Sequence, residues 1–335
     1  MTRAHGLTRR STLALMAAAA AVPARAAETE VKIGIGFGLA FLPCYILDEL
    51  KLVEKHAKAA GLEAKATYSR FSGTGPMQDA ILSGAIDMGP LGISGVLLVR
   101  EKARGTAQEM VAISGVSTLP LVLITNQPNI KKLADFKPSD RISMPSIVSP
   151  QMYLLQMQAE KEFGRGQYDK MKPQVVSLPH PDSLNALLAG TEVTAYFSPP
   201  PFTQIALKNQ KISRVMSSTE IMGPASFIIM GALKRYTDTN PKVPEVISKA
   251  MDEAAALIKN DAKQAAEIYL KREPQKLIDQ AGIEAILKEY RDDYGSAVQG
   301  VQAYAELMGR LGQLKNPPKS WKEIVTPNIA GTQSS

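Results

Sequence analysis

The stretch SRFSGTGPMQDAILSGAIDMGPLGISG, residues 69–95, contains the pattern on which the fold depends. It reads as the end of a strand, a Gly-rich turn, a helix, a glycine, a short strand and a second Gly-rich turn. The first turn ends just before Pro76, and Ser or Thr shortly before Pro is typical of a helix start. We expect a helix from near Pro76 to Gly84 and a buried strand over residues 86–89.

A second copy of this pattern lies later in the chain, in HPDSLNALLAGTEVTAYFSPPP, residues 180–201. Leu184, Leu187 and Leu188 repeat the apolar face of the helix, Gly190 matches Gly84, and residues 193–197 form the strand. Two copies of one helix–glycine–strand unit predict two similar α/β lobes. Sheets of this kind bind ligands in the crevice beyond the carboxyl ends of their strands.

Composition indicates a globular protein without a nucleic-acid partner. The 335 residues suffice for two domains, and 45% hydrophobic and 21% charged residues are ordinary values for a soluble protein. The formal net charge is +7, but Arg3, Arg9, Arg10 and Arg25 lie in the first 26 residues, which contain no Asp or Glu. Without these four the net charge falls from +7 to +3. Such a small excess gives no electrostatic case for binding nucleic acid.

The first 26 residues have the pattern of a signal peptide rather than of a buried helix. A basic start precedes the apolar run 13–22, which is too short to span a bilayer, and Ala24-Arg25-Ala26 predicts cleavage near Ala26. Residues 8–13, TRRSTL, resemble a twin-arginine export signal, but Thr12 replaces the usual Phe, so general secretory export stays open.

The rest of the chain has neither a membrane-spanning pattern nor a cysteine pair. No segment after residue 27 approaches about eighteen consecutive apolar residues, so we expect no membrane insertion. Cys44 is the single cysteine, which excludes an intrachain disulfide. We therefore expect a free, exported protein in the periplasm.

The chain order predicts a discontinuous first lobe. Strands are expected at residues 31–37, 63–71, 111–116, 119–125, 141–144, 174–178, 213–217 and 226–232. Helices are expected at 44–60, from near Gly92 to Arg104, and at 151–163. Ser117 and Thr118 split two strands and mark a crossing between lobes, so we assign residues 27–118 and 224–335 to lobe 1 and residues 119–223 to lobe 2. Residues 241–314 predict several helices without strands, which we expect on the outside of lobe 1.

Four segments together resemble the solute-binding proteins of ABC importers. They are the strand at 31–37, GAID at 84–87, ALLAG at 186–190 and PKSWKEI at 318–324. The branch that they resemble handles nitrate, taurine, alkanesulfonates and thiamine-pyrimidine precursors. The resemblance covers essentially the whole chain after the signal peptide. It implies the two-lobed α/β fold called periplasmic-binding-protein type II, with a ligand cleft between the lobes and a helical C-terminal tail.

The resemblance also implies a function and a binding site. It implies a monomer that captures a small molecule by lobe closure and delivers it to a membrane permease with a cytoplasmic ATPase. The family's ligand contacts come from turns after strands, which implies a site made of Phe37, Gly38, Phe41, Arg70, Ser72, Gly73, Thr74, Gly92, Ser94, Ser117, Ser146, Ser149, Gln151, Phe197 and Ser198.

The chemistry of these turns leaves more than one interpretation open. Hydroxyls at helix starts, with free amides and the positive end of the helix dipole, suit an oxyanion, whereas plain capping would stabilise each helix by roughly 1 kcal/mol. Arg70 is the one cationic residue placed to pair with a sulfonate or carboxylate, and we expect an anionic solute of that kind. Alternatively, Phe37, Phe41, Tyr153 and Phe197 wall an apolar or aromatic ligand. The second copy also departs from the family pattern at GTEVT, residues 190–194.

An enzyme on the same fold is the rival interpretation. After the signal peptide, His56, His180 and Cys44 are the whole supply of imidazole and thiol, and they form no recognised metal-site spacing. GISG, residues 92–95, is one residue short of a nucleophile elbow, and the cysteine cluster of related pyrimidine-synthesising enzymes is missing. We expect no catalysis, no cofactor and no metal, with a hydrolase assembled only in space as the alternative. Whether Arg70 or His180 faces the cleft stays open.

Overall fold

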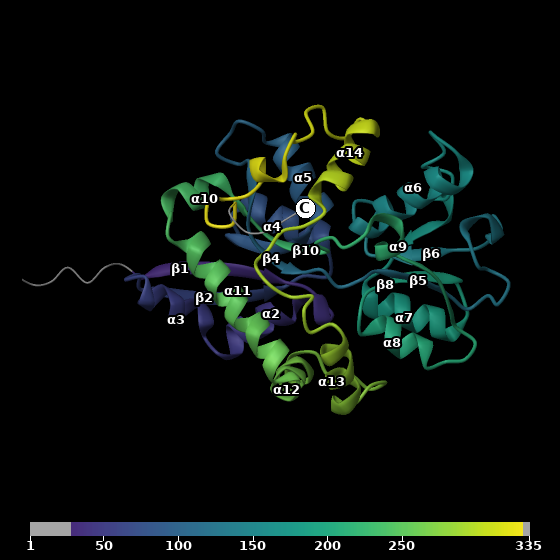
Figure 1. Ribbon diagram of the computed structural model, residues 1–335, viewed down its shortest axis with the longest axis horizontal. Helices are drawn as coiled ribbons and strands as arrows, with labels where there is room; N and C mark the ends of the chain where they lie inside the picture. The colour runs from purple at the N-terminus through teal and green to yellow at the C-terminus, as the bar shows by residue number, and fades with distance from the viewer. Residues whose placement is uncertain (1–27, 331–335) are drawn as a thin grey trace, which may run out of the picture.

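The fold consists of two mixed β-sheets, each covered by helices (Figure 1). The computed structural model describes residues 28–330. Sheet A has the strand order β2-β1-β3-β10-β4 and sheet B the order β7-β6-β8-β5-β9. The strands of sheet A are β1 (Thr29–Ile35), β2 (Ala64–Arg70), β3 (Met88–Gly92), β4 (Met110–Ser117) and β10 (Ile228–Leu233). Those of sheet B are β5 (Val122–Thr125), β6 (Ile142–Met144), β7 (Val175–Ser177), β8 (Ala195–Ser198) and β9 (Ser213–Ser217).

The two sheets have the same arrangement of parallel and antiparallel strands, and each receives one strand after a crossover from the other lobe. In sheet A, β1 is parallel to β2 and β3, while β10 is antiparallel to β3 and β4. In sheet B, β6 is parallel to β7 and β8, while β5 is antiparallel to β8 and β9. The chain crosses from β4 to β5 and returns from β9 to β10, so two crossovers join the sheets. We call sheet A with its helices lobe A and sheet B with its helices lobe B; the predicted two-lobed α/β fold is confirmed.

The helix–glycine–strand unit occurs once in each lobe, as predicted. In lobe A, α4 (Thr74–Ser83) ends at Gly84 with φ 79° and leads to β3. In lobe B, α7 (His180–Ala189) ends at Gly190 with φ 67° and leads to β8. Glycine suits both ends because a left-handed backbone strains other residues. Strand β3 starts later than the predicted residue 86, because the Ile86 amide still bonds back to the Ala80 carbonyl and holds residues 84–86 in the helix-ending turn.

The prediction of one continuous helix over residues 44–60 is wrong, because the segment forms two helices. It consists of α2 (Leu42–Glu49) and α3 (Leu52–Ala59), separated at Lys51, whose φ of 52° is left-handed. The break lets Leu52 and Val53 turn into the core, where both are buried. The other helices before the tail are α5 (Ile93–Lys102), α6 (Pro150–Phe163), α8 (Phe202–Leu207), α9 (Ser218–Met222) and α10 (Lys234–Thr239). Short 3₁₀ turns occur at Leu39–Phe41, Leu133–Asp135, Lys172–Gln174 and Trp321–Glu323.

The C-terminal tail is helical, as predicted, but it contacts both lobes. Its helices are α11 (Val243–Asn260), α12 (Ala262–Arg272), α13 (Gln280–Glu289) and α14 (Val301–Arg310). Helix α11 packs on α2, α3 and β4, which agrees with the prediction that the tail covers the first lobe. Helix α14 differs, because it packs on both α5 of lobe A and α6 of lobe B (Figure 1). The Tyr153 hydroxyl on α6 donates to Gln313 Oε1, 2.6 Å away, just beyond α14.

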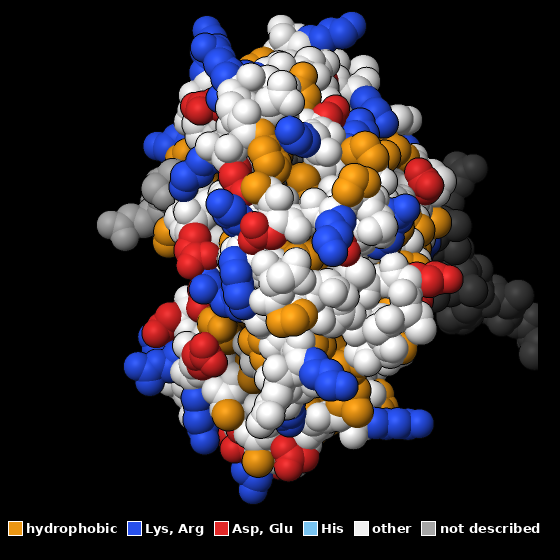
Figure 2. All heavy atoms as spheres, turned by 90° about the vertical axis from the view of Figure 1, so that its right-hand side faces the viewer, with side chains coloured by type: hydrophobic (Ala, Val, Ile, Leu, Met, Phe, Trp, Pro, Cys, Tyr) orange, Lys and Arg blue, Asp and Glu red, His pale blue; other side chains and the backbone are white. Residues whose placement is uncertain are grey.

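Two further observations concern the surface charge and the lengths of the helices. On the face shown in Figure 2, basic and acidic side chains are interspersed, so this face carries no continuous basic stripe of the kind that binds nucleic acid. Within residues 28–330, no helix is both long and apolar enough to cross a membrane. The predicted signal peptide, residues 1–26, lies outside the described residues.

Candidate ligand-binding site

A pocket lies between the two lobes, at the carboxyl ends of their parallel strands. Gly36 and Phe37 follow β1, Phe71 follows β2, and Pro145 follows β6. This is the edge at which ligands bind in open α/β sheets. The cavity volume is about 40 Å³. The lining consists of Gly36, Phe37, Phe41, Phe71, Ser72, Gly73, Thr74, Met77, Pro90, Gly92, Pro145, Ser149, Pro150, Gln151, His180, Phe227 and Ile228.

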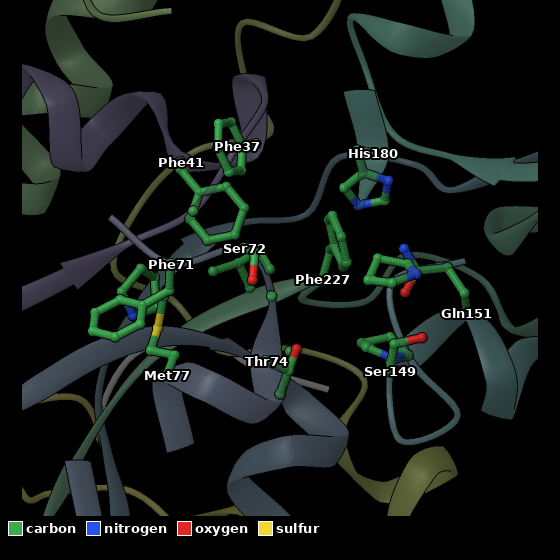
Figure 3. A pocket seen from close by; sticks show the side chains of 17 residues that line it. Phe37, Phe41, Phe71, Ser72, Thr74, Met77, Ser149, Gln151, His180 and Phe227 are labelled. Carbon is green, nitrogen blue, oxygen red and sulfur yellow. The ribbon is translucent and has the colours of Figure 1, made fainter. Parts of the chain in front are cut away.

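Aromatic rings form one side of this pocket. Figure 3 shows Phe37 and Phe41 together, with Phe71 and Met77 below them and Phe227 toward the middle. Phe37 and Phe41 come from the turn after β1, and Phe227 precedes β10. These rings offer flat apolar surfaces, which favour a ligand with an apolar or aromatic body.

Two helix starts supply the polar side of the pocket. Helix α4 begins at Thr74 in lobe A and helix α6 begins at Pro150 in lobe B, and neither start has a side-chain cap hydrogen bond. The capping alternative is therefore wrong at both turns. The Ser149 hydroxyl donates instead to the Ser146 carbonyl at 2.7 Å. The amides of Thr74 and Gly75 in α4 and of Gln151 in α6 have no acceptor within their own helix, so they are available to a ligand.

Gln151 is the most unusual polar residue of the pocket. Its side chain is 1% exposed, and neither Nε2 nor Oε1 has a hydrogen-bond partner among the described residues. An unpaired buried donor or acceptor costs about 1–3 kcal/mol, and native proteins contain few of them. In Figure 3 the amide end of Gln151 is directed into the pocket, with Ser72 and Thr74 on the opposite side.

His180 also faces the pocket, which answers one question that the sequence left open. Its Nδ1 lies 2.6 Å from the hydroxyl of Tyr196, and its ring stacks on Phe202 at 5.6 Å. Burial lowers the pKa of His180 to about 3, so the ring is neutral near pH 7. Because the buried Tyr196 hydroxyl has no other acceptor among the described residues, we assign its proton to the bond with Nδ1. Nε2 then carries the ring proton.

Arg70 does not line the pocket. It is exposed, and its guanidinium donates to the carbonyl of Arg272 at 3.1 Å. The guanidinium carbon lies 5.0 Å from the ring centre of Phe37 and 5.2 Å from that of Tyr45. No Lys, Arg, Asp or Glu is among the lining residues that the structure describes. The pocket therefore has no cationic side chain to pair with an anion.

Eight residues of the predicted site lie together in the pocket. They are Phe37, Phe41, Ser72, Gly73, Thr74, Gly92, Ser149 and Gln151. Seven, including Arg70, lie outside the lining: Gly38, Arg70, Ser94, Ser117, Ser146, Phe197 and Ser198. Phe197 and Ser198 belong to β8, in the middle of sheet B. Phe197 is buried in the core, and the Ser198 hydroxyl hydrogen-bonds within lobe B to Thr203 and to the Val122 carbonyl. Ser117 is buried at the crossover.

Gly38, Ser94 and Ser146 support the site instead of lining it. The Gly38 amide donates to Oε2 of the buried Glu273 at 2.8 Å, which fixes the turn that carries Phe37. The Ser94 hydroxyl donates to the Val148 carbonyl of the other lobe at 2.9 Å. The Ser146 hydroxyl accepts from the Val148 amide at 3.2 Å and so shapes the turn before α6.

Direct contacts across the cleft show that the lobes are closed. The Leu39 amide of lobe A donates to the Pro200 carbonyl of lobe B at 3.2 Å. Gly92 at the end of β3 lies so close to Pro150 that an added Cβ would stand 2.5 Å from the proline ring. A cavity of about 40 Å³ is small for an organic ligand, so a ligand has to enter when the lobes are further apart.

The sequence interpretation missed several lining residues. Phe71, Met77, Phe227 and Ile228 line the pocket and were not predicted. Phe71 directly precedes the predicted Ser72 turn, and this adjacency was a usable signal. Phe227 reaches the pocket only because β10 returns from lobe B and pairs between β3 and β4, which a local pattern does not reveal.

Two features bear on the enzyme alternative: the grouping of metal-ligand side chains and the state of Cys44. Within residues 28–330, no three His, Cys, Asp or Glu side chains are grouped to hold a metal ion. Cys44 is buried in lobe A, and burial raises its pKa to about 12, which keeps the thiol protonated and unreactive.

Known structures share this fold. The periplasmic aliphatic sulphonate binding protein SsuA from Escherichia coli is 18% identical with a TM-score of 0.67, over 90% of this chain and 99% of that chain. The alkanesulfonate-binding protein SsuA from Xanthomonas axonopodis pv. citri, bound to MOPS, is 17% identical with a TM-score of 0.69, over 92% and 100%. The periplasmic nitrate-binding protein NrtA from Synechocystis PCC 6803 is 11% identical with a TM-score of 0.69, over 91% and 87%.

These likenesses establish the fold as that of periplasmic binding proteins. No curated protein matches the sequence. The model of the NMT1-like family matches residues 24–270, which is well over half of the chain. The chain therefore belongs to the NMT1-like family.

Proposed function

We propose that this protein is an extracytoplasmic substrate-binding protein of an ABC importer. The observation that carries the proposal is a pocket lined from both lobes, at the carboxyl ends of the strands, with the lobes in direct contact around it. A ligand that touches both lobes favours the closed form, and a closed, loaded protein is a distinct signal for a transporter.

The partners and the location follow from the same proposal. The closed protein would deliver its ligand to a membrane permease driven by a cytoplasmic ATPase, without a cofactor and as a monomer. It would act in the periplasm after export and cleavage near Ala26. Residues 27–118 with 224–335 and residues 119–223 would move as the two bodies, about the crossovers that follow β4 and precede β10.

The chemical class of the solute needs a narrower argument. An anion, sulfonate- or carboxylate-like, is what the sequence predicts. The starts of α4 and α6 support it, since each has at least one backbone amide without an acceptor in its own helix and the positive end of a helix dipole. The described lining provides no cationic side chain, and this observation leads to a different class in the next subsection.

An enzyme, either a hydrolase or a pyrimidine-synthesising type, is the alternative. His180 is the one titratable imidazole of the pocket, and its low pKa and bond to Tyr196 make it a poor general base near pH 7. This supports a binding protein over an enzyme.

A thermal-shift screen of the chain from Ala27 tests the proposal. The panel holds sulfonates, nitrate, carboxylates, amides, pyrimidines and amino acids. A ligand at a hundred times its Kd stabilises the protein by about 2.7 kcal/mol, which raises Tm by about 4 °C for a chain of this length. A hit that is recovered unaltered supports a binding protein, whereas chemical conversion of the hit would contradict it.

A further inference from the structure

Gln151 offers a ligand two hydrogen-bonding groups that no described residue uses. Its side chain is 1% exposed, and both Nε2 and Oε1 are buried without a partner. Gln151 is the second residue of α6, and Figure 3 shows its amide directed into the pocket. Buried polar groups in native proteins are paired, so an unpaired amide in a pocket points to a missing partner.

The two groups together restrict the chemistry of that partner. A glutamine amide presents a donor beside an acceptor, and this remains true whichever way the amide is turned. A partner that satisfies both needs its own acceptor beside a donor, as in a carboxamide, a lactam or a cyclic urea. Sulfonate, nitrate and carboxylate groups carry acceptors alone, so they would leave Gln151 Oε1 unpaired and facing negative oxygens.

The charge of the pocket favours the same conclusion. No charged side chain is among the described lining residues, and the imidazole of His180 is neutral near pH 7. An anion placed here would lose its hydration without gaining an ion pair, which is unfavourable in a closed site. An uncharged ligand avoids this cost and still uses the free backbone amide of Gln151 at the start of α6.

The remaining walls describe the body of the ligand. Phe37, Phe41, Phe71 and Phe227 contribute rings, and Met77 adds an adaptable apolar side chain. Flat apolar surfaces on one side of the pocket, with the Gln151 amide on the other, suit a planar apolar molecule that carries a polar edge.

On the basis of the proposed function, we infer that the pocket recognises an uncharged solute with an amide-like edge on an apolar body, and that Gln151 pairs with both atoms of that edge. The amide-like edge lies at the start of α6, and the body lies among the phenylalanine rings.

Two matched series of probes test this inference by calorimetric titration. The first is benzamide, benzoate and benzenesulfonate; the second, with smaller bodies, is propionamide, propionate and ethanesulfonate. In at least one series the amide should bind at least tenfold more tightly than both anions. A tenfold ratio corresponds to about 1.4 kcal/mol.

The variant Gln151→Met removes both polar atoms and keeps the length of the side chain. We expect it to weaken binding of the amide at least tenfold and to melt at the same temperature as the wild type or higher, because an unpaired amide leaves the core. The matched control is Gln156→Met on the same helix. Gln156 is also buried, and its Oε1 likewise has no partner among the described residues. Its Nε2, however, donates to Asp169 at 2.8 Å, and Gln156 does not line the pocket. This control should melt lower and bind the amide as the wild type does.

Tighter binding of an anion than of its amide, retained in Gln151→Met, would overturn the inference and leave the proposed function standing. Failure of all six probes to bind would also overturn it. Conversion of a bound probe into a product would instead contradict the proposed function. Selective binding of the amide, lost in Gln151→Met and kept in Gln156→Met, is the result that supports the inference.

Discussion

Replacing Gly92 by alanine tests whether the lobes close by direct contact beside the pocket. A Cβ at this position would lie 2.5 Å from Cγ and Cδ of Pro150, while the next nearest atom, the Phe227 carbonyl oxygen, is 3.9 Å away. The backbone of Gly92, with φ −58° and ψ 143°, suits any residue. Alanine therefore adds no backbone strain to lobe A, and its clash acts between the lobes.

The size of the effect follows from this contact. Carbon atoms in contact stand about 3.5–4.0 Å apart, so alanine requires the lobes to separate by about 1 Å at this point. The nearby hydrogen bond from Ser94 Oγ to the Val148 carbonyl is 2.9 Å long and would not survive that separation. Overpacking costs about 1–3 kcal/mol. If the clash destabilises the closed form by about 2 kcal/mol relative to the open form, the ratio of closed to open protein falls about 30-fold.

Pulsed electron paramagnetic resonance measures the distance between two spin labels, one on each lobe, and so reports the opening of the lobes. Asp79→Cys on α4 and Asp182→Cys on α7 place one label at an exposed position of each lobe. The native Cys44 is buried and does not compete for the label. We expect Gly92→Ala to shift the distances between labels to longer values. Its ligand affinity should fall by up to about 30-fold, because the competent closed form is less populated.

Two further variants show whether the effect of Gly92→Ala comes from its contact with Pro150 or from adding a methyl group near the pocket. Gly75→Ala is the matched control, since no atom lies within 4 Å of a Cβ added there. Pro150→Ala, combined with Gly92→Ala, removes Cγ and Cδ and should restore the wild-type distances. Unchanged label distances and unchanged ligand affinity in Gly92→Ala would refute this account of closure.

Three other predictions concern buried groups. Glu273→Gln should lower the free energy of unfolding in urea by about 2 kcal/mol, because its buried side chain accepts the hydrogen bond from the Gly38 amide. Glu253→Gln, at a partly exposed position that pairs with Lys55, should change the same free energy by under about 1 kcal/mol. His180 stays neutral in the folded protein, whereas in the unfolded chain it takes up a proton below about pH 6.5. The free energy of unfolding should therefore fall by about 2 kcal/mol from pH 6.5 to pH 5. The variant His180→Gln should lack this part of the pH dependence. The Cys44 thiol, with its pKa raised to about 12, should react with a disulfide reagent at pH 8 only as fast as the protein unfolds; rapid reaction of folded protein would contradict its burial.

The fold could be predicted largely because its signals are local. Gly84 and Gly190 each end a helix in the left-handed conformation, and each is followed by a short buried strand. These signals identify the repeated unit without knowledge of distant contacts. The break at Lys51 was missed for the opposite reason, since no glycine or proline marks it and the apolar spacing continues across it.

The site was less predictable, because its side chains depend on contacts between distant segments. A turn after a strand could be located from sequence, but the direction of each side chain could not. Arg70 lies at the end of the expected strand, yet its guanidinium donates to the carbonyl of Arg272, far along the chain, and it does not line the pocket. The tail's Glu273 fixes the turn of Gly38 in the same way. The unpaired state of Gln151 is a property of the closed pocket as a whole, which no local pattern reveals.

Two neighbouring residues at the start of α6 connect recognition with closure. Pro150 makes the contact with Gly92 that limits how closely the lobes approach, and Gln151 carries the unpaired amide. Both move with lobe B. In an open form, water would solvate the Gln151 amide, whereas empty closure leaves two buried groups unpaired at about 1–3 kcal/mol each. A ligand that pairs with both groups removes this cost in the closed form alone. The amide therefore makes closure depend on the ligand, so that the empty protein is held back from the state that a transporter would accept.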